Sequence, residues 1–399
     1  MTTAVPLHEI ARGLDDPAEL ARAVDDLLEA RTEPPTVLAL GEPTHGIEAF
    51  PLLRNDFLVH LAERGYRSIA LETDIVAATL VDDHVTGVTN LDTAPATGFS
   101  HGFGAIPGNR ELLQWLRAYN NDRSPQDRIH FHGFDAPTEY AAAPSPRRYL
   151  RAAADHLPEA LRPDSASDLD TLSGADADWS NEAAMYDPAA SIGDSDRARA
   201  LRLIADDLAG ALRRAARPLR AADPIGYDRA VTHARTAVGL LRYHATMARP
   251  APDRIADLMA VRSEMMADNL LAIVAQEQHR GPTLVFAHNA HLQRARSGAD
   301  MNRCSAGTLV AAALGERYMF LAADAAPASA PGTLHHLLAQ ATTRRALFPA
   351  PALRAALPRS LEPTEPVVRG HIPLTLADLS GADAVVFIAD TDGKQFRYW

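Results

Sequence analysis

The sequence predicts an α/β fold with a central, mostly parallel sheet that is flanked by helices. Two observations predict it. Six short apolar runs have the length and composition of strands covered on both faces. Helix-like patterns separate most of these runs, as in successive β–α–β units. The expected strands are Thr36–Leu40, Arg67–Leu71, Arg128–His132, Thr283–Ala287, Tyr318–Ala322 and Ala384–Ala389.

The long connection between the third and fourth runs is a third observation. Residues 143–282 carry helical periodicity and breaks rich in Pro, Ala and Asp, without a convincing strand. We therefore expect a large α-helical insertion or cap over residues 143–282. Residues 1–142 and 283–399 would then be the N-terminal and C-terminal parts of the α/β core.

Composition and charge restrict the class of protein. The chain has 399 residues, of which 47% are hydrophobic, with a net charge of −12. An acidic surface argues against nucleic acid and anionic membranes as partners. Cys304 is the single cysteine, and no apolar run approaches the roughly 18 residues of a membrane span. No signal peptide is visible, so we expect a cytoplasmic enzyme with a small-molecule substrate; its oligomeric state stays open.

Polar, reactive side chains follow four of the predicted strands at the point where each strand ends. In a parallel sheet these carboxyl ends share one edge, where open α/β folds bind ligands. We therefore expect the four segments to converge on one site. They are the turn Gly41–Gly46 after the first strand, Glu72 and Asp74 after the second, Asp135 after the third, and His288 and His291 after the fourth.

The turn Gly41-Glu42-Pro43-Thr44-His45-Gly46 offers a base. A histidine can act as a general base near neutral pH if a carboxylate fixes its tautomer. Glu42 and Glu72 are the candidate partners of His45. The turn is equally consistent with a His45 that merely caps the following helix and a solvated Glu42.

Two arginines occupy apolar helix faces. Arg54 lies within the apolar stripe of the helix expected over residues 48–64. A buried guanidinium needs a carboxylate or a ligand, so Arg54 meets Glu42, Glu72 or substrate, or forms a structural ion pair. In the helix expected over residues 253–278, Arg262 either reaches the site from the cap or belongs to a packing network.

His288 and His291 directly follow a strand, and their spacing places both rings on one side of a helical turn. That arrangement suits metal ligands, or one acid and one orienting group. Further metal ligands would come from His45, Glu72 or Asp135. The pattern is not H-E-x-x-H and no cysteine cluster supports zinc, so the sequence does not require a metal.

Residues 98–102, Gly-Phe-Ser-His-Gly, match the G-x-S-x-G pattern of serine hydrolases. That motif needs a preceding strand and a following helix, and turn-like residues flank it here. We therefore do not expect Ser100 to be a nucleophile. Residues 98–108 are interpreted as a loop over the cleft, with His101 and Phe103 as substrate contacts, or as a plain surface loop.

Taken in order along the chain, these motifs resemble the erythromycin esterase family from about residue 35 to residue 390. The segments that carry the resemblance are Gly41–Gly46, Arg54, Ala70–Glu72, Phe131–Asp135, Arg262–Asn269 and Phe286–His291. The resemblance implies hydrolysis of macrolactone esters by histidine-activated water, without a required metal or cofactor. One departure is Pro43 and Thr44, where characterised resistance esterases usually carry two serines.

By this resemblance we expect a hydrolase that cleaves an ester or lactone of a macrolide or another natural product. The expected catalytic residues are His45, Glu42, Glu72, Arg54 and His288. The expected substrate-binding residues are His291, His101, Phe103, Asp74, Asp135 and Arg262. Three alternatives stay open: a tailoring enzyme that performs acyl transfer, cyclisation or elimination at the same site, a metallohydrolase, and a non-catalytic ligand-binding protein.

Overall fold

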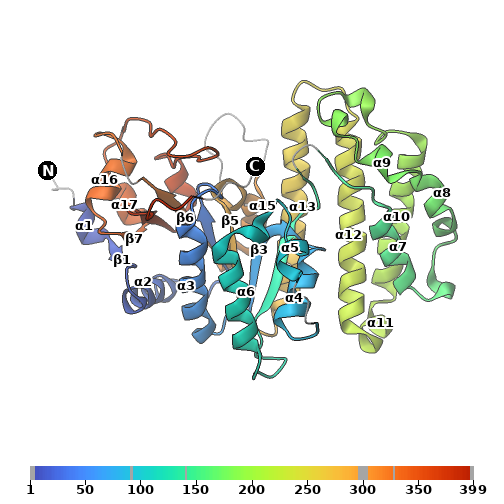
Figure 1. Cartoon of the computed structure of the whole chain (residues 1–399), viewed down its shortest axis with the longest axis horizontal. Coiled ribbons are helices and arrows are strands. Elements are labelled where there is room, and N and C mark those ends of the chain that lie inside the picture. Colours follow the sequence, from blue (N-terminus) through green and yellow to red (C-terminus); the bar gives the residue numbers. More distant parts are fainter. Residues whose placement is uncertain (1–4, 90–92, 140–141, 295–303, 327–328, 396–399) are drawn as a thin grey trace. The chain divides into compact units, whose positions relative to one another are not determined.

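The computed structural model describes residues 5–89, 93–139, 142–294, 304–326 and 329–395 (Figure 1). In this part of the chain, one eight-stranded sheet has the order β1-β7-β8-β6-β2-β5-β3-β4. The pairs β2–β5, β2–β6, β3–β5 and β6–β8 are parallel, whereas β7 is antiparallel to both β1 and β8. The predicted mostly parallel α/β fold is confirmed. The strands are β1 (Arg12–Gly13), β2 (Val37–Glu42), β3 (Ser68–Asp74), β4 (His130–Asp135), β5 (Thr283–His288), β6 (Tyr318–Ala325), β7 (Arg345–Pro349) and β8 (Ala384–Ile388).

All six predicted strands occur, and most extend further at the carboxyl end than expected. β2 continues through Gly41 to Glu42, and β6 continues to Ala325. The two strands that were not predicted, β1 and β7, form the antiparallel edge of the sheet. β1 has only two residues and β7 ends in proline, so neither carries the apolar run of a buried parallel strand.

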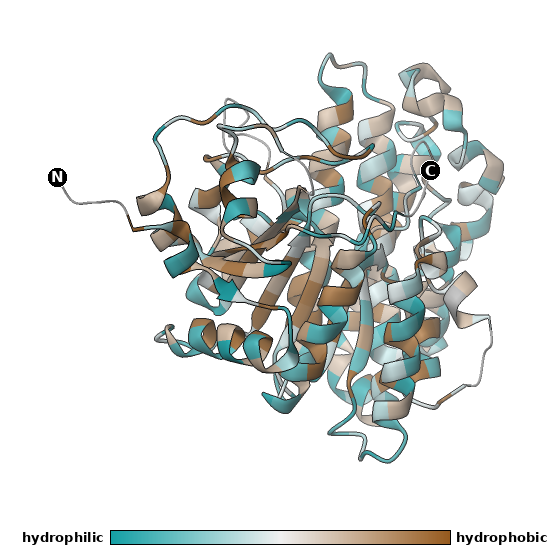
Figure 2. Ribbon diagram, turned by 60° about the vertical axis from the view of Figure 1, so that its left-hand side comes forward, coloured by the Kyte–Doolittle hydropathy of each residue, from teal (hydrophilic) through white to brown (hydrophobic). Residues whose placement is uncertain are grey.

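The chain divides into two compact units. The first comprises residues 1–72, 78–133 and 270–399. Its helices pack apolar faces on a sheet whose strands are strongly hydrophobic (Figure 2). In α3 (Ala49–Glu63), for example, Phe50, Leu53, Phe57, Leu58 and Leu61 are buried. The other helices are α1 (Leu7–Ile10), α2 (Pro17–Glu29), α4 (Ala78–Val85), α5 (Ala94–Thr97), α6 (Pro107–Asn120), α14 (Asn289–Leu292), α15 (Ala306–Leu314), α16 (Leu334–Gln340) and α17 (Ala350–Ala356), with short 3₁₀ turns at Phe103–Ala105, Gly315–Arg317 and Asp378–Gly381.

The second unit comprises residues 73–77 and 134–269 and has its own core, which includes Tyr149, Trp179 and Leu240. No strand lies between residues 143 and 282 in the described part of the chain. The unit begins and ends earlier than the expected insertion over residues 143–282, and its role as a cap stays a prediction. Its helices are α7 (Arg147–His156), α8 (Leu169–Ser173), α9 (Asp176–Trp179), α10 (Asp196–Arg214), α11 (Ala216–Ala222), α12 (Pro224–Met247) and the first part of α13 (Arg254–Glu277).

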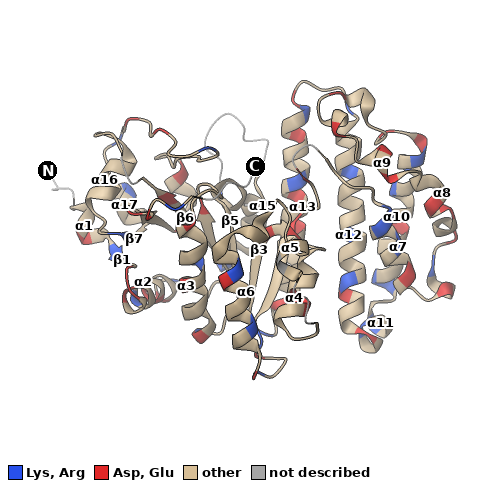
Figure 3. Ribbon diagram, in the orientation of Figure 1, with Lys and Arg blue, Asp and Glu red and all other residues tan. Residues whose placement is uncertain are grey.

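Acidic and basic residues are spread along the helices and loops, and fewer of them lie on the strands (Figure 3). The carboxylates that lie on strands are buried: Glu42, Glu72, Asp74, Asp135 and Asp324. None of the described helices combines the length and apolar character needed to cross a bilayer.

A side chain joins the carboxyl ends of β2 and β6. Their backbone pairing stops at Leu40 and Leu321. Beyond that point, Asn289 Nδ2 donates to the Ala323 carbonyl at 2.7 Å, and Asn289 Oδ1 accepts from the Ala323 N–H at 3.1 Å. The carboxamide thus takes the place of a peptide unit. It also explains Gly41, where a Cβ atom would lie 2.0 Å from Asn289 Oδ1.

We expect Gly41→Ala to lower the free energy of unfolding by about 2–4 kcal/mol. The methyl group would displace the Asn289 carboxamide and leave the buried N–H and C=O of Ala323 unpaired, at about 1–3 kcal/mol each. Urea unfolding followed by far-UV circular dichroism measures the change. If the effect runs through Asn289, Gly41→Ala should add little to Asn289→Ala in the double variant. Full additivity of the two effects would contradict this explanation.

Candidate active site

His45 lies between two buried carboxylates. Its Nδ1 is 2.7 Å from Glu42 Oε1, a hydrogen bond in which the ring N–H donates. Its Nε2 is 3.7 Å from Glu72 Oε1. With Nδ1–H donated to Glu42, a neutral His45 keeps its lone pair on Nε2, on the side of Glu72. This tautomer is the one that a general base at Nε2 requires.

The surroundings of His45 strengthen it as a base. Burial alone lowers the pKa of His45, but the negative charge of Glu72 and the hydrogen bond to Glu42 outweigh burial and raise this pKa above its ordinary value. Burial also raises the pKa of Glu42, and the contact with His45 only partly offsets that effect. An imidazolium formed at His45 would therefore be stabilised from both sides.

His288 is committed to the protein by both ring nitrogens. Its Nε2–H donates to the Pro43 carbonyl at 2.9 Å, and its Nδ1 accepts from the Ala290 N–H at 3.1 Å. Burial lowers the pKa of His288 to about 3, so the ring is neutral. Its backbone N–H donates to Glu72 Oε2 at 2.9 Å. We expected His288 to be a catalytic residue, but its one ring N–H is engaged with Pro43, and it instead fixes the turn and Glu72.

His291 is the more accessible member of the histidine pair. It lies in α14, and its Nε2 is 3.2 Å from Glu72 Oε1. The side chain of His291 is 20% exposed, whereas His288 is buried. Glu72 Oε1 therefore lies near the Nε2 atoms of both His45 and His291.

Arg54 is buried, as its place in the apolar stripe of α3 predicts, but its hydrogen bonds go elsewhere than expected. It donates to Asn109 Oδ1 at 2.7 Å, to the Gly108 carbonyl at 3.1 Å and to Asn55 Oδ1. In the described residues it forms no hydrogen bond or ion pair with Glu42 or Glu72. Burial lowers the pKa of Arg54 to about 9, and the charge of Glu42 opposes that shift.

The loop at residues 98–108 packs on the site. The Phe103 ring centroid is 4.7 Å from that of His45 and 5.4 Å from that of His101. His101 has a positive φ of 55°, which only a few per cent of non-glycine residues adopt. Ser100 follows the helical turn α5 rather than a strand, so the strand–turn–helix context of a serine nucleophile is not present there.

A small cavity adjoins His45. It has a volume of about 20 Å³, which is room for one water molecule. Glu42 Oε2 is buried and has no hydrogen-bond partner among the described residues. Five polar residues and an apolar wall therefore surround a space that suits a single water. The cavity is lined by Glu42, His45, Arg54, Glu72 and Asn109, with Pro51, Leu71, Phe99, Phe103, Ile106 and Phe286.

Residues 61–366 match the erythromycin esterase family. The chain belongs to that family. The matched range includes Glu72, His288 and His291 and begins after the turn that holds Glu42 and His45. No curated protein matches the sequence.

Solved structures share the fold of this family member. A protein of Bacillus cereus aligns with a TM-score of 0.71 and 16% identity over 96% of this chain and 95% of that one. A succinoglycan biosynthesis protein aligns with a TM-score of 0.64 and 14% identity, over 96% and 95% of the two chains. A histidine-to-asparagine mutant of the erythromycin esterase EreC, in its open conformation, aligns with a TM-score of 0.64 and 17% identity, over 98% of both chains.

The remaining predicted site residues lie in the second compact unit of this esterase-family chain. Arg262 donates to both oxygens of Asp135, at 2.9 Å and 2.5 Å, and Asp135 is fully buried. Asp74 Oδ1 accepts from the Val76 N–H at 2.7 Å, and Asp74 Oδ2 lies 3.8 Å from a guanidinium nitrogen of Arg148. We predicted Asp74, Asp135 and Arg262 as substrate contacts. Their protein partners instead favour the packing network that the sequence left open for Arg262, because buried carboxylates need partners.

Two groups near the site were not predicted. Asn289 lies between His288 and His291 in the sequence, and its position at a strand end was a usable signal. The Ile372 N–H donates to the Pro43 carbonyl at 3.0 Å, so that this carbonyl accepts two hydrogen bonds. A backbone amide leaves no trace in side-chain patterns, so no sequence pattern points to Ile372.

Proposed function

We propose that the protein is a hydrolase that cleaves an ester or lactone by water activated at His45. The observation that carries the proposal is the placement of His45 between Glu42 and Glu72, in the lining of a cavity that has room for one water. Family membership supports hydrolysis of an ester bond. A lactone of a macrolide or another natural product is the substrate class that we propose.

The proposed reaction has two steps. A water molecule transfers a proton to His45 Nε2 while its oxygen bonds to the carbonyl carbon of the ester, which gives a tetrahedral oxyanion. Collapse of this intermediate breaks the bond to the alcohol oxygen, and that oxygen takes the proton from Nε2. The products are a free acid and a free alcohol, and His45 returns to its neutral form.

Glu42 and Glu72 have different roles in this proposal. Glu42 holds the Nδ1–H and so keeps the tautomer, while both carboxylates stabilise the imidazolium that forms between them. Arg54 lines the cavity and is the proposed source of positive charge for the oxyanion; such a donor is typically worth about 3 kcal/mol. The backbone N–H of Gly46, next to His45, is engaged by Thr44 Oγ1, to which it donates at 3.1 Å.

The alternatives differ in what happens to water and metal. Acyl transfer, cyclisation or elimination could use the same base, but none would place a water oxygen in the product. A metallohydrolase would draw ligands from His45, Glu72, His288 and His291. The engagement of both His288 nitrogens disfavours that set, because a ligand nitrogen would first have to leave Pro43 or Ala290.

Turnover in oxygen-18 water tests the proposal. A panel of macrolide lactones and aryl esters is incubated with the enzyme, and the acid products are examined by mass spectrometry. We expect one labelled oxygen in each acid, and activity that survives both exhaustive chelation and Ser100→Ala. Unlabelled products would favour a tailoring reaction, and activity lost on chelation and restored by zinc would favour a metallohydrolase. A ligand that binds tightly and is recovered unchanged would contradict catalysis.

A further inference from the structure

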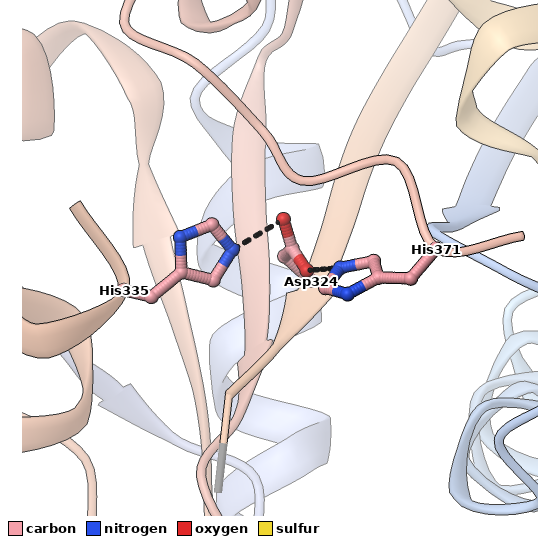
Figure 4. A group of neighbouring side chains, drawn as sticks. All are labelled: Asp324, His335 and His371. Atoms are coloured by element: carbon pink, nitrogen blue, oxygen red, sulfur yellow. Dashed lines mark hydrogen bonds and ion pairs between the residues drawn. The ribbon is translucent and has the colours of Figure 1, made fainter. Parts of the chain in front are cut away.

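A second cluster of titratable side chains lies in the first unit, apart from the residues of the proposed reaction. Asp324 is near the end of β6, His335 is in α16, and His371 is in the segment between α17 and β8. His371 Nε2 is 2.8 Å from Asp324 Oδ1, and His335 Nε2 is 2.7 Å from Asp324 Oδ2 (Figure 4). All three side chains are buried.

This donor set could in principle hold a metal ion, but its hydrogen bonds favour another role. His371 Nδ1 accepts from the Val367 N–H at 2.9 Å, so Nε2 carries the proton and donates it to Asp324. A metal-bound histidine instead donates through its second nitrogen. The 2.7 and 2.8 Å separations are also shorter than the roughly 3.3 Å between two ligands of a tetrahedral zinc with bonds of about 2.0 Å.

Asp324 holds a short segment of chain at two points. Its Oδ1 accepts from His371, and its Oδ2 accepts from the Leu374 N–H at 2.6 Å. These two contacts bracket Ile372. The amide of Ile372 donates to the Pro43 carbonyl, within the turn that connects Glu42 to His45. Two hydrogen bonds, joined by the peptide bond between His371 and Ile372, therefore link Asp324 to that turn.

His335 touches the same carboxylate without this connection. Its Nε2 lies close to Asp324 Oδ2 but lacks the alignment of a hydrogen bond, and its Nδ1 is 2.6 Å from Thr364 Oγ1. Within the described residues, α16 forms no hydrogen bond or ion pair with Pro43 or His45. His335 and His371 are thus both buried and both close to Asp324. They differ because only His371 is followed by a residue, Ile372, that forms a hydrogen bond with the turn.

We propose that Asp324 and His371 are positioning residues for His45: they fix the Ile372 amide against the Pro43 carbonyl and so hold the turn in the geometry of the Glu42–His45 hydrogen bond. The proposal rests on the proposed function, in which His45 is the base. Neither residue touches the reacting atoms, so their effect would pass through the turn alone.

The test compares two matched variants. Asparagine keeps an acceptor near the position of histidine Nδ1 and removes the Nε2–H, so His371→Asn and His335→Asn each lose the group next to Asp324. We expect both to lower the melting temperature. Only His371→Asn should lower kcat, by about tenfold to a hundredfold with little change in KM, because small displacements of a base have effects of this size. His371→Gln, which keeps a donor near Nε2, should recover part of the loss.

A pH profile separates positioning from general destabilisation. His45 is faced by Glu42 from β2, Glu72 from β3, His101 from the 98–108 loop and His288 from the end of β5. His371→Asn changes none of these groups. It should weaken the hydrogen bond between Glu42 and His45, and because that bond raises the pKa of His45, the pKa should fall. The acid limb of kcat/KM should therefore move to lower pH in this variant and stay in place in His335→Asn.

The pKa of His45 can also be read without turnover, from the ring carbon-13 signal in labelled enzyme, assigned with His45→Gln. If wild-type enzyme hydrolyses none of the esters while His371→Asn still lowers this pKa, the proposed function fails and the positioning role stands. Equal kcat losses and an unmoved His45 pKa in the two asparagine variants would overturn the positioning role. So would a stoichiometric divalent metal in purified enzyme that Asp324→Asn abolishes.

Discussion

His45→Gln is expected to lower kcat/KM by about 10²–10⁴-fold, the range for loss of a general base. Glutamine fills most of the space of the ring but has no basic nitrogen, so water would attack without proton removal. The Nε2 atom of His45 is the only position in the proposed reaction that accepts this proton. Steady-state kinetics with the best ester of the panel measures the effect, and urea unfolding verifies that the variant is folded.

His60→Gln is the matched control. His60 lies in the same unit, near the far end of α3, and its Nε2 is 2.8 Å from Asp25 Oδ1. It is thus another partly buried histidine paired with a carboxylate, but one outside the cavity. We expect unchanged kinetics in His60→Gln. A His45→Gln enzyme that loses less than about tenfold in kcat/KM would exclude His45 as the base.

Glu42→Gln is expected to lower kcat by about 10²–10³-fold and to shift the acid limb of the pH profile to lower pH. The kcat loss follows because a carboxamide can offer its NH₂ group to Nδ1 and so no longer enforces the tautomer. The pH shift follows because the hydrogen bond and charge of Glu42 raise the pKa of His45, and an uncharged side chain removes both. His45 acts only when unprotonated, so a lower pKa extends activity to lower pH.

Glu72→Gln provides the comparison that separates the two carboxylates. The charge of Glu72 raises the pKa of His45, as the hydrogen bond and the charge of Glu42 also do. Glu72→Gln should therefore also move the acid limb to lower pH, but unlike Glu42→Gln it keeps the Nδ1 anchor of His45. An acid limb that stays in place in both variants would show that the limb reports a group other than His45.

The strands in the parallel part of the sheet could be predicted from the sequence, because buried parallel strands are continuous apolar runs. The sequence also predicted that the residues following these strands lie close together, since the carboxyl ends of parallel strands share an edge of the sheet. His45, Glu72 and His288 come from three separate strand ends and meet for this reason. The carboxyl ends of β2 and β6 extended beyond the apolar runs because Glu42 and Asp324 are polar yet buried and paired.

Partners that are distant in sequence could not be predicted. Arg54 bonds to the Gly108–Asn109 segment and not to a carboxylate because of the way α6 packs on α3. The periodicity of the sequence carries no information on that packing. The same holds for the ring nitrogens of His288, whose roles are set by a carbonyl of one segment and an amide of another. Sequence patterns identify the face on which a side chain lies, whereas hydrogen-bond partners are fixed by packing.

The size of the cavity beside His45 has a consequence for the choice of nucleophile. A chamber of about 20 Å³ admits water and is far too small for the alcohol released from a lactone or a long-chain ester. In the proposed reaction, the nucleophile that reaches the carbonyl carbon through this chamber would therefore be water. A bulky alcohol would be excluded as the nucleophile by its size, so exchange of one ester for another would not compete with hydrolysis even where alcohols are abundant.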